Sequence, residues 1–282
     1  HDGPEHVIEE LTLQLEQKKS ADLYHKRAIE YRQLSEYKKA ITDLREALKI
    51  NPRHFEARLE LAQVLITVRK TDEALKVLRI ALAAEQSAAK RLAIFGALAL
   101  AYDAAGDVAA AIHYCASALE LAPDDLDLLL LRSELFWRAG AYQRRAEDLE
   151  SAFRRTGSAI LRADWIDAML DAGHFSAVKS DIEKEIAESR LKSAWLIRRA
   201  RCSAAESNSA ASHGDISAAL LELDSRIRPH QPDTSLLLQR AHARALSADK
   251  ARAQADLKAA ARAGAAPHGL ARISSIIKNM KR

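Results

Sequence analysis

The sequence predicts an all-α protein, a right-handed α-solenoid of about seven helical hairpins with one helix before them and one capping helix after them. The first observation is a repeat in the stretch 21–86, where Ala40 recurs as Ala74 and Leu44 as Leu78. The second is the small number of helix breakers, nine Gly and six Pro in 282 residues. Two amphipathic helices in each repeat are typical of stacked hairpins, because one hairpin cannot bury its apolar flank alone.

Each repeat carries two apolar faces at helical spacing. In the first repeat, Tyr24, Ala28 and Tyr31 share one face of a first helix. Ala40 and Leu44 share one face of the second helix. Alanine lets two helices approach closely, and the larger side chains fill the remaining space. The pattern therefore predicts helices that pack in pairs.

The order of these residues resembles the tetratricopeptide repeat (TPR) family. Between Tyr24 and Pro52 the chain carries an aromatic, a small residue and an aromatic, then Ala, Leu, Ala and a proline that ends the second helix. The resemblance is close over residues 21–153 and fades afterwards. It implies the solenoid fold and a role in binding other proteins rather than in catalysis.

The repeat pattern divides the chain into three parts. Residues 1–20 form an N-terminal segment with a leading helix, residues 21–265 form the superhelix, and residues 266–282 form the capping helix. Within the superhelix the pattern is regular to about residue 153, degenerate over 158–230 and regular again over 234–264.

The two end helices have apolar sides of their own. The leading helix spans 4–17 and starts with proline, which is well tolerated at the first helical position. Its apolar residues are Val7, Ile8, Leu11, Leu13 and Leu15. The last helix, 270–280, carries Ile273, Ile276 and Ile277 on one face, and we expect it to cover the open end of the array.

Three departures from the repeat are visible. The third repeat follows a short insertion, and Gly106 makes the turn between its helices. Arg145 stands where the pattern has alanine, which predicts packing shifted by one residue. In the sixth repeat the polar stretch 207–215, SNSAASHGD, predicts a mobile or inserted loop that delays the second helix to about 216–227.

The distribution of charge argues against a nucleic-acid partner. Lys and Arg number 43 against 39 Asp and Glu, and the basic residues are spread over many helices without interleaved aromatic side chains. This distribution predicts solvated helix faces. No apolar run is long enough to span a bilayer as a helix, so no transmembrane segment is expected.

The opening residues bear on location. The chain begins with His1 rather than Met, and HDGPEHVIEELT is similar to the mature start of exported bacterial TPR proteins. This similarity implies a periplasmic or extracellular bacterial protein released by a signal peptidase. A cytoplasmic location is the alternative if the first residue does not mark a natural cleavage.

The sequence contains no motif for catalysis or cofactor binding. A glycine-rich phosphate loop, H-E-x-x-H, C-x-x-C and G-x-S-x-G are all missing. We expect Cys115 and Cys202 to be small buried residues too far apart for a disulfide. Asp124, Asp125 and Asp127 stand at a helix start, which favours capping over a metal site. The sequence therefore predicts a protein that is not an enzyme and that needs no cofactor.

A metal site at the N-terminus is a minor alternative. If His1 is the natural terminus, its α-amine and imidazole chelate a metal, and His6 adds a third nitrogen ligand. The other interpretation is a solvated terminus without a ligand. These two histidines are the only candidates for a metal-binding exported protein.

The resemblance also implies where a partner binds. In TPR proteins the second, fifth, ninth and twelfth positions of each first helix line a concave groove. In this chain the lining is more apolar than a solvated face requires, which marks a binding surface, and Trp137 is the expected anchor. The predicted groove residues are Ile29, Leu59, Gln63, Ile66, Leu100, Leu130, Glu134 and Trp137.

We expect the groove to hold an extended or helical segment of another protein, mainly by apolar contacts. His25 and Ile29 stand where relatives that grip a terminal carboxylate carry Lys and Asn, which argues against that kind of chaperone docking. Two alternatives stay open. Some of the groove residues pack against neighbouring first helices instead, or the chain is a structural subunit of a homo- or hetero-oligomeric assembly.

Overall fold

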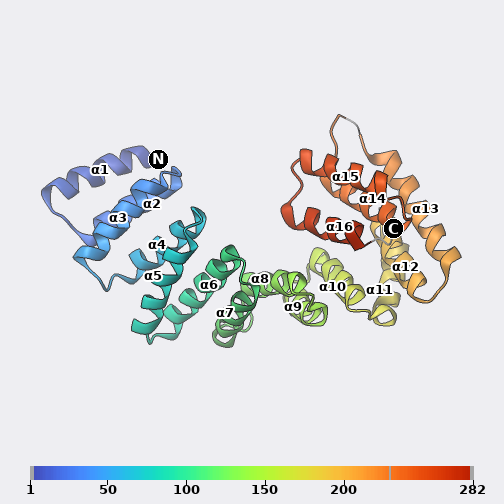
Figure 1. The fold of residues 1–282 in the computed structure, drawn as a ribbon, viewed down its shortest axis with the longest axis horizontal. Coiled ribbons are helices and arrows are strands. Elements are labelled where there is room, and N and C mark those ends of the chain that lie inside the picture. Colours follow the sequence, from blue (N-terminus) through green and yellow to red (C-terminus); the bar gives the residue numbers. More distant parts are fainter. Residues whose placement is uncertain (1–2, 229, 280–282) are drawn as a thin grey trace. The chain divides into compact units, whose positions relative to one another are not determined.

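The structure, a computed structural model, describes residues 3–228 and 230–279, and these residues form sixteen α-helices (Figure 1). A first helix α1 (Pro4–Gln17) is followed by seven hairpins and by α16 (Pro267–Asn279). The hairpins are α2 (Ala21–Gln33) with α3 (Tyr37–Ile50), α4 (Phe55–Thr67) with α5 (Thr71–Ala84), α6 (Ala88–Ala105) with α7 (Val108–Leu121), α8 (Leu126–Arg138) with α9 (Tyr142–Thr156), α10 (Ala159–Asp171) with α11 (Phe175–Glu188), α12 (Ser193–Ala205) with α13 (Ser209–Arg226), and α14 (Thr234–Leu246) with α15 (Lys250–Arg262). The predicted all-α helical repeat is confirmed.

The chain divides into two compact units. Unit 1 ends at Trp165 and unit 2 begins at Ile166. The division falls inside α10, so the C-terminal part of that helix belongs to unit 2. Each unit has its own buried apolar core, and the two are described separately.

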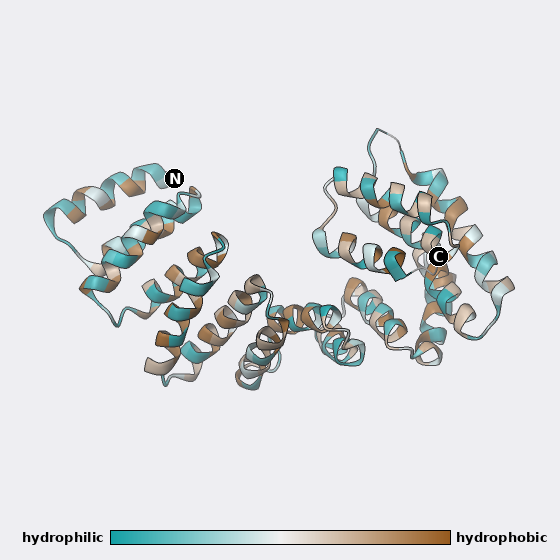
Figure 2. Cartoon of the chain, in the orientation of Figure 1, coloured by the Kyte–Doolittle hydropathy of each residue, from teal (hydrophilic) through white to brown (hydrophobic). Residues whose placement is uncertain are grey.

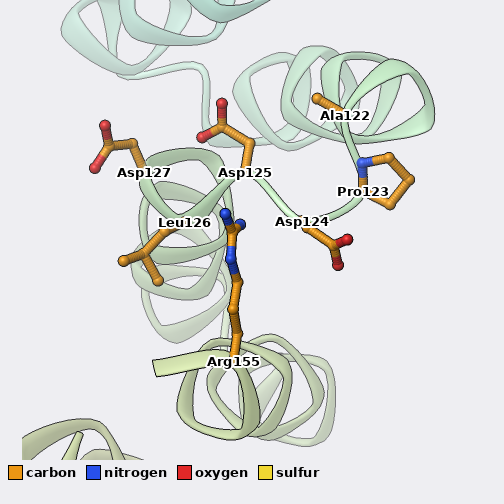
Figure 3. A pocket seen from close by; sticks show the side chains of 7 residues that line it. All are labelled: Ala122, Pro123, Asp124, Asp125, Leu126, Asp127 and Arg155. Atoms are coloured by element: carbon orange, nitrogen blue, oxygen red, sulfur yellow. The ribbon is translucent and has the colours of Figure 1, made fainter. Parts of the chain in front are cut away.

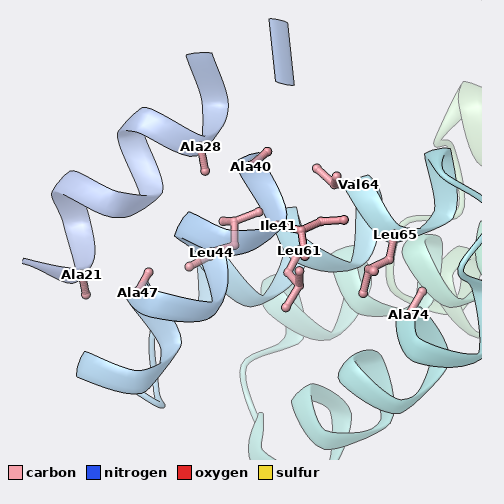
Figure 4. Packing of buried hydrophobic residues seen from close by; sticks show 11 residues of the cluster. Ala21, Ala28, Ala40, Ile41, Leu44, Ala47, Leu61, Val64, Leu65 and Ala74 are labelled. Carbon is pink, nitrogen blue, oxygen red and sulfur yellow. The ribbon is translucent and has the colours of Figure 1, made fainter. Parts of the chain in front are cut away.

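Each regular hairpin is built on a close contact of small side chains. Ala28 of α2 lies with Ala40 and Ala47 of α3 in one core, and none of the three has exposed surface (Figure 4). Leu61 and Leu65 of α4 belong to the same core. The core therefore continues from one hairpin to the next, which is what the stacking of repeats requires. Figure 2 shows the resulting alternation of apolar and polar residues along the helices.

The turn inside each hairpin uses the left-handed backbone conformation at the same place. In all seven described hairpins, the residue two positions before the second helix has a positive φ. Three of these residues are glycines and four carry a side chain: Gly106, Gly140 and Gly173, and Ser35, Arg69, Ser207 and Ala248. The predicted turn at Gly106 is confirmed, but residue type gave no sign of the other four.

The predicted loop in the sixth repeat is wrong. Residues 209–215 are the first two turns of α13, which begins at Ser209. Asn208 makes this possible, because its side chain accepts a hydrogen bond from the Ala211 backbone N–H at 3.1 Å. Ser207 makes the tight turn that ends α12. The polar residues of the stretch are helix-capping and helix-surface residues rather than an insertion.

Two further details of the sequence prediction are also wrong. Arg145 does not shift the packing, because α9 begins two residues after its turn glycine, as in the other hairpins, and Ala152 is fully buried. Leu13 does not share the buried side of α1, since it is 60 % exposed whereas Leu11 and Leu15 are buried. At the helical rotation of roughly 100° per residue, a side chain two positions from both buried leucines points away from them.

A buried ion pair recurs in four of the described hairpins. In each, an arginine of the first helix donates two hydrogen bonds to an aspartate 16 residues later on the second helix, at distances between 2.6 and 3.0 Å. The pairs are Arg27–Asp43, Arg132–Asp148, Arg199–Asp215 and Arg240–Asp256. The second and third repeats carry Leu61–Val77 and Leu98–Tyr114 at the equivalent places. The same position therefore accepts two opposite charges or two apolar groups, and the fifth repeat carries Trp165 and Asp181 there.

We expect Ala248→Gly to raise the free energy of unfolding by about 0.5–1 kcal/mol, because glycine adopts the left-handed conformation without strain.

The reverse change, Gly140→Ala, should lower the free energy of unfolding by about 1 kcal/mol. A Cβ at Gly140 meets no atom within 4 Å, so this loss would not come from a steric clash with neighbouring side chains. Urea unfolding measures both, and Ala218→Gly, on the exposed middle of α13, is the control that should cost about 1 kcal/mol. Equal effects at Ala248 and Ala218 would contradict the strain argument.

We expect Arg132→Leu or Asp148→Val alone to lower the free energy of unfolding by about 2–4 kcal/mol, because each leaves a largely buried charge without its partner. The double variant copies the apolar pair of the second repeat, so it should lose less than either single variant. A double-mutant cycle in urea measures this coupling. Losses that simply add would show that the two side chains act independently.

Candidate functional site

All eight predicted groove residues lie on first helices of unit 1. Ile29 lies on α2, Leu100 on α6, and the others on α4 and α8. The helices α2, α4 and α6 pack side by side (Figure 1). We call the surface of α2, α4, α6 and α8 that carries these eight residues the unit 1 first-helix face.

The apolar residues of this face differ in how much of each side chain is buried in the core. Leu59 and Ile66 pack against the buried clusters between neighbouring hairpins. Leu100 is 47 % exposed. Ile29 and Trp137 are partly exposed. The face therefore offers apolar surface that solvent can reach, supported by two residues that also stabilise the stack.

Charged residues of the face pair with one another between neighbouring first helices. Arg32 of α2 approaches Glu60 of α4, with 2.5 Å between Nε and Oε1. Arg138 of α8 forms an ion pair with Asp103 of α6. These pairs neutralise the charge of Arg32 and Arg138 within the face, which also carries the exposed Gln63 and the half-buried Glu134. The sequence does not predict these pairs, because the partners come from different repeats and meet only when the repeats stack.

The end of the face at α2 carries two histidine rings. His25 and His54 pack edge to face, with ring centroids 5.0 Å apart. His54 is buried, and its Nε2 lies 3.0 Å from Asp22 Oδ1. Burial, together with His54, lowers the pKa of His25 below its ordinary value. His25 is therefore neutral at pH 7, and this end of the face is polar but carries no strong positive charge.

The acidic turn before α8 acts as a helix cap. The Asp125 side chain accepts a hydrogen bond from the Leu128 backbone N–H at 3.0 Å. Arg155 extends toward this turn and lines an open hollow of about 600 Å³ with it (Figure 3). Within the described part of the chain, no three His, Cys, Asp or Glu side chains are grouped as metal ligands. The capping role expected for this stretch is therefore observed at Asp125.

The N-terminal histidines remain a prediction. His1 lies outside the described residues. His6 lies on α1 with its Nε2 4.0 Å from Glu10 Oε1, one helical turn away. Both cysteines are free and buried, as expected. Burial raises the pKa of the Cys115 thiol to about 12, so this sulfur stays protonated at pH 7.

The first helices of unit 2 carry an ion-pair cluster instead of an apolar surface. It consists of two aspartates of α10, two arginines of α12 and one arginine of α16: Asp167, Asp171, Arg198, Arg201 and Arg272. Arg198 donates two hydrogen bonds to Asp167, at 2.9 and 3.0 Å. Arg272 donates a third to Asp167, at 3.1 Å. Because these side chains are between 11 % and 22 % exposed, they fill this side of unit 2 with paired charge.

The cluster sets the ionisation of its neighbours. The three arginines hold the pKa of Asp167 well below its usual range, against the opposing effect of burial. His242 of α14 faces the same groups. Burial, Arg201 and Arg272 lower its pKa to about 3. His242 is therefore neutral in the folded protein at any pH well above 3.

No helix in the described part of the chain is both long enough and apolar enough to cross a membrane.

Comparison with known proteins identifies the repeat. Residues 31–93 and residues 92–125 match two sequence models described as tetratricopeptide repeat. Among solved structures, a tetratricopeptide repeat protein from Parabacteroides merdae has a TM-score of 0.60 at 16 % identity, with 92 % of this chain and 99 % of that chain covered. MamA from Desulfovibrio magneticus has a TM-score of 0.50 at 24 % identity, with 55 % and 88 % covered. The comparison with curated proteins gives no match. These structural likenesses show the fold alone.

We expect the stability of unit 2 to fall as the pH drops from about 6.5 toward about 3. In this window the unfolded chain protonates His242 whereas the folded chain does not, so acid favours unfolding. Between about pH 7.5 and 4.5 the loss from this residue should be about 2–3 kcal/mol. Urea unfolding at the two pH values measures it. His242→Gln should remove this part of the loss, and His113→Gln, on the exposed surface of α7, should not. The same pH dependence in both variants would assign the acid sensitivity elsewhere.

Proposed function

We propose that this chain, which has tetratricopeptide repeats at residues 31–125 and the fold of such proteins overall, is a non-catalytic scaffold that binds a segment of a partner protein on the unit 1 first-helix face. Solenoids of helical hairpins present extended surfaces suited to this task. The repeats of residues 21–265 would form the scaffold.

One observation carries the proposal. Leu100 and Trp137 expose apolar surface on neighbouring first helices, on a face whose arginines are paired with acidic groups. Contact with apolar side chains of a partner would be favourable, because it would remove the apolar surface of this face from water. Tryptophan is among the side chains that contribute most to binding at interfaces.

The chemistry of the face indicates the kind of segment it would take. A terminal carboxylate has no free cation to meet at His25, which is neutral, or at Arg32, which is paired. An amphipathic helix or an extended segment with apolar anchors fits better, because it matches the exposed leucine and tryptophan. The ion pairs of the face would then fix the position of the bound segment along the helices more than they would raise its affinity.

Site-specific photo-crosslinking tests the location. A benzophenone amino acid in place of Leu100 should crosslink the partner in an extract of the source cells. The matched control is the same amino acid in place of Ile80, which is 59 % exposed on the second helix α5. A partner captured through Leu100 but not through Ile80 supports the first-helix face. Capture through Ile80 alone would place binding on the second helices instead.

With the partner identified, Trp137→Ala should weaken its binding by more than about 1 kcal/mol, or at least about fivefold, because the indole would lose its contact area. Isothermal titration calorimetry measures this change. Tyr142→Ala, on the exposed surface of α9, removes an aromatic ring outside the face and should leave the affinity unchanged. Equal affinities of the native protein and the Trp137 variant would remove the proposed anchor.

A further inference from the structure

The unit 1 first-helix face is acidic, although the chain as a whole is basic. The full sequence carries 43 Lys and Arg against 39 Asp and Glu. On this face the sign is reversed. The second, fifth, ninth and twelfth repeat positions of α2, α4, α6 and α8 carry one arginine, Arg32, and five carboxylates, Asp22, Glu56, Asp103, Asp127 and Glu134.

The cations of α6 and α8 are all bound to other groups of the chain. The lysine and the arginine of α6 contact Glu85, which lies before the helix. The two arginines of α8 are bound as well, Arg132 to Asp148 of α9 and Arg138 to Asp103 of α6. Within the described part of the chain, these two helices therefore keep no free cation on the face.

Glu134 is a carboxylate of the face that has no cation beside it. It is half-buried, and it forms no ion pair or side-chain hydrogen bond with any described residue. Arg138, one helical turn further along α8, binds Asp103 instead. Asp127 differs from Glu134, because it lines the same open hollow as Arg155 (Figure 3). The charge of Glu134 is therefore stabilised by the water that reaches it.

The place of Glu134 on α8 couples it to the proposed anchor. Leu130, Glu134 and Trp137 follow one another at intervals of four and three residues, so they share one side of the helix. A segment that covers Leu130 and Trp137 would also cover Glu134 between them and displace its water. Burying an ionised carboxylate without a cation is strongly unfavourable.

The bound segment would therefore have to supply the cation. A Lys or Arg with apolar residues one turn before and one turn after it would match the three side chains of α8, and a second helix lying along α8 has this spacing. An acidic or wholly apolar segment would leave Glu134 buried and unpaired, so the face would reject it. Asp22 and Glu56, at the other end of the face, are 79 % and 62 % exposed and would attract further basic residues.

We propose that the segment bound by the unit 1 first-helix face is a basic amphipathic helix, with a Lys or Arg against Glu134 and apolar residues over Leu130 and Trp137. This inference rests on the proposed function and adds the chemistry of the segment to it.

A displayed library of random peptides tests the proposal with the full chain. Peptides of about 16 residues are long enough for about four helical turns. Among the peptides that the native protein retains and Trp137→Ala loses, Lys and Arg should outnumber Asp and Glu. Glu134→Lys should retain acidic peptides instead, because it places a cation between the two apolar side chains. The matched control is Glu120→Lys, on the exposed surface of the second helix α7, which should retain the same basic peptides as the native protein.

Isothermal titration calorimetry with the tightest of these peptides measures the contribution of the carboxylate. Glu134→Gln should weaken binding about fivefold or more and should reduce its dependence on salt, because one charge pair is lost. Glu120→Gln should change neither.

The outcomes separate this inference from the proposed function. Peptides that depend on Trp137 but show no excess of Lys and Arg would overturn the basic helix and leave the proposed function standing. So would basic peptides whose affinity is unchanged by Glu134→Gln. A library that yields no peptide dependent on Trp137 would contradict the proposed function, and this inference with it.

Discussion

The close contact between alanines inside the regular hairpins is the constraint on which the rest of the structure depends. Ala28, Ala40 and Ala47 have no exposed surface, and a larger side chain at any of them would separate the two helices. Only helices held this close present a flank flat enough for the next hairpin. The stack, its turns and its first-helix surface all follow from this spacing. Arg145 replaces one of these small residues in the fourth hairpin, but the start of α9 and the buried Ala152 keep their places in the repeat.

Much of the fold could be predicted from the sequence, because the small residues recur with the period of the hairpin. The helix bounds follow from that period to within a few residues, and α1 was predicted at its observed bounds. The turns were harder, since Arg69 and Ala248 are not turn-forming residue types and only their spacing marks them. The stretch 207–215 was assigned to a loop because its polar composition outweighed the capping residue Asn208.

The sites were less predictable than the fold, for a physical reason. The period assigns a residue to the first-helix face, but it does not tell which neighbour its side chain meets. Asp167 and Arg272 are 105 residues apart in the chain, and their contact depends on the curvature of three successive hairpins in unit 2. In unit 1 the repeat position of Asp167 holds Ile29 and Leu100. One pattern therefore yields an apolar surface in one unit and a buried ionic cluster in the other.

The buried thiols give the two units an unusual property. Cys115 lies in unit 1 and Cys202 in unit 2, and neither is reachable by solvent in the folded chain. Burial also raises the pKa of both thiols, so little reactive thiolate is present at neutral pH. An alkylating reagent would reach each sulfur only during an opening of its own unit. The protein thus contains one natural reporter of local opening in each half, with no engineered label required.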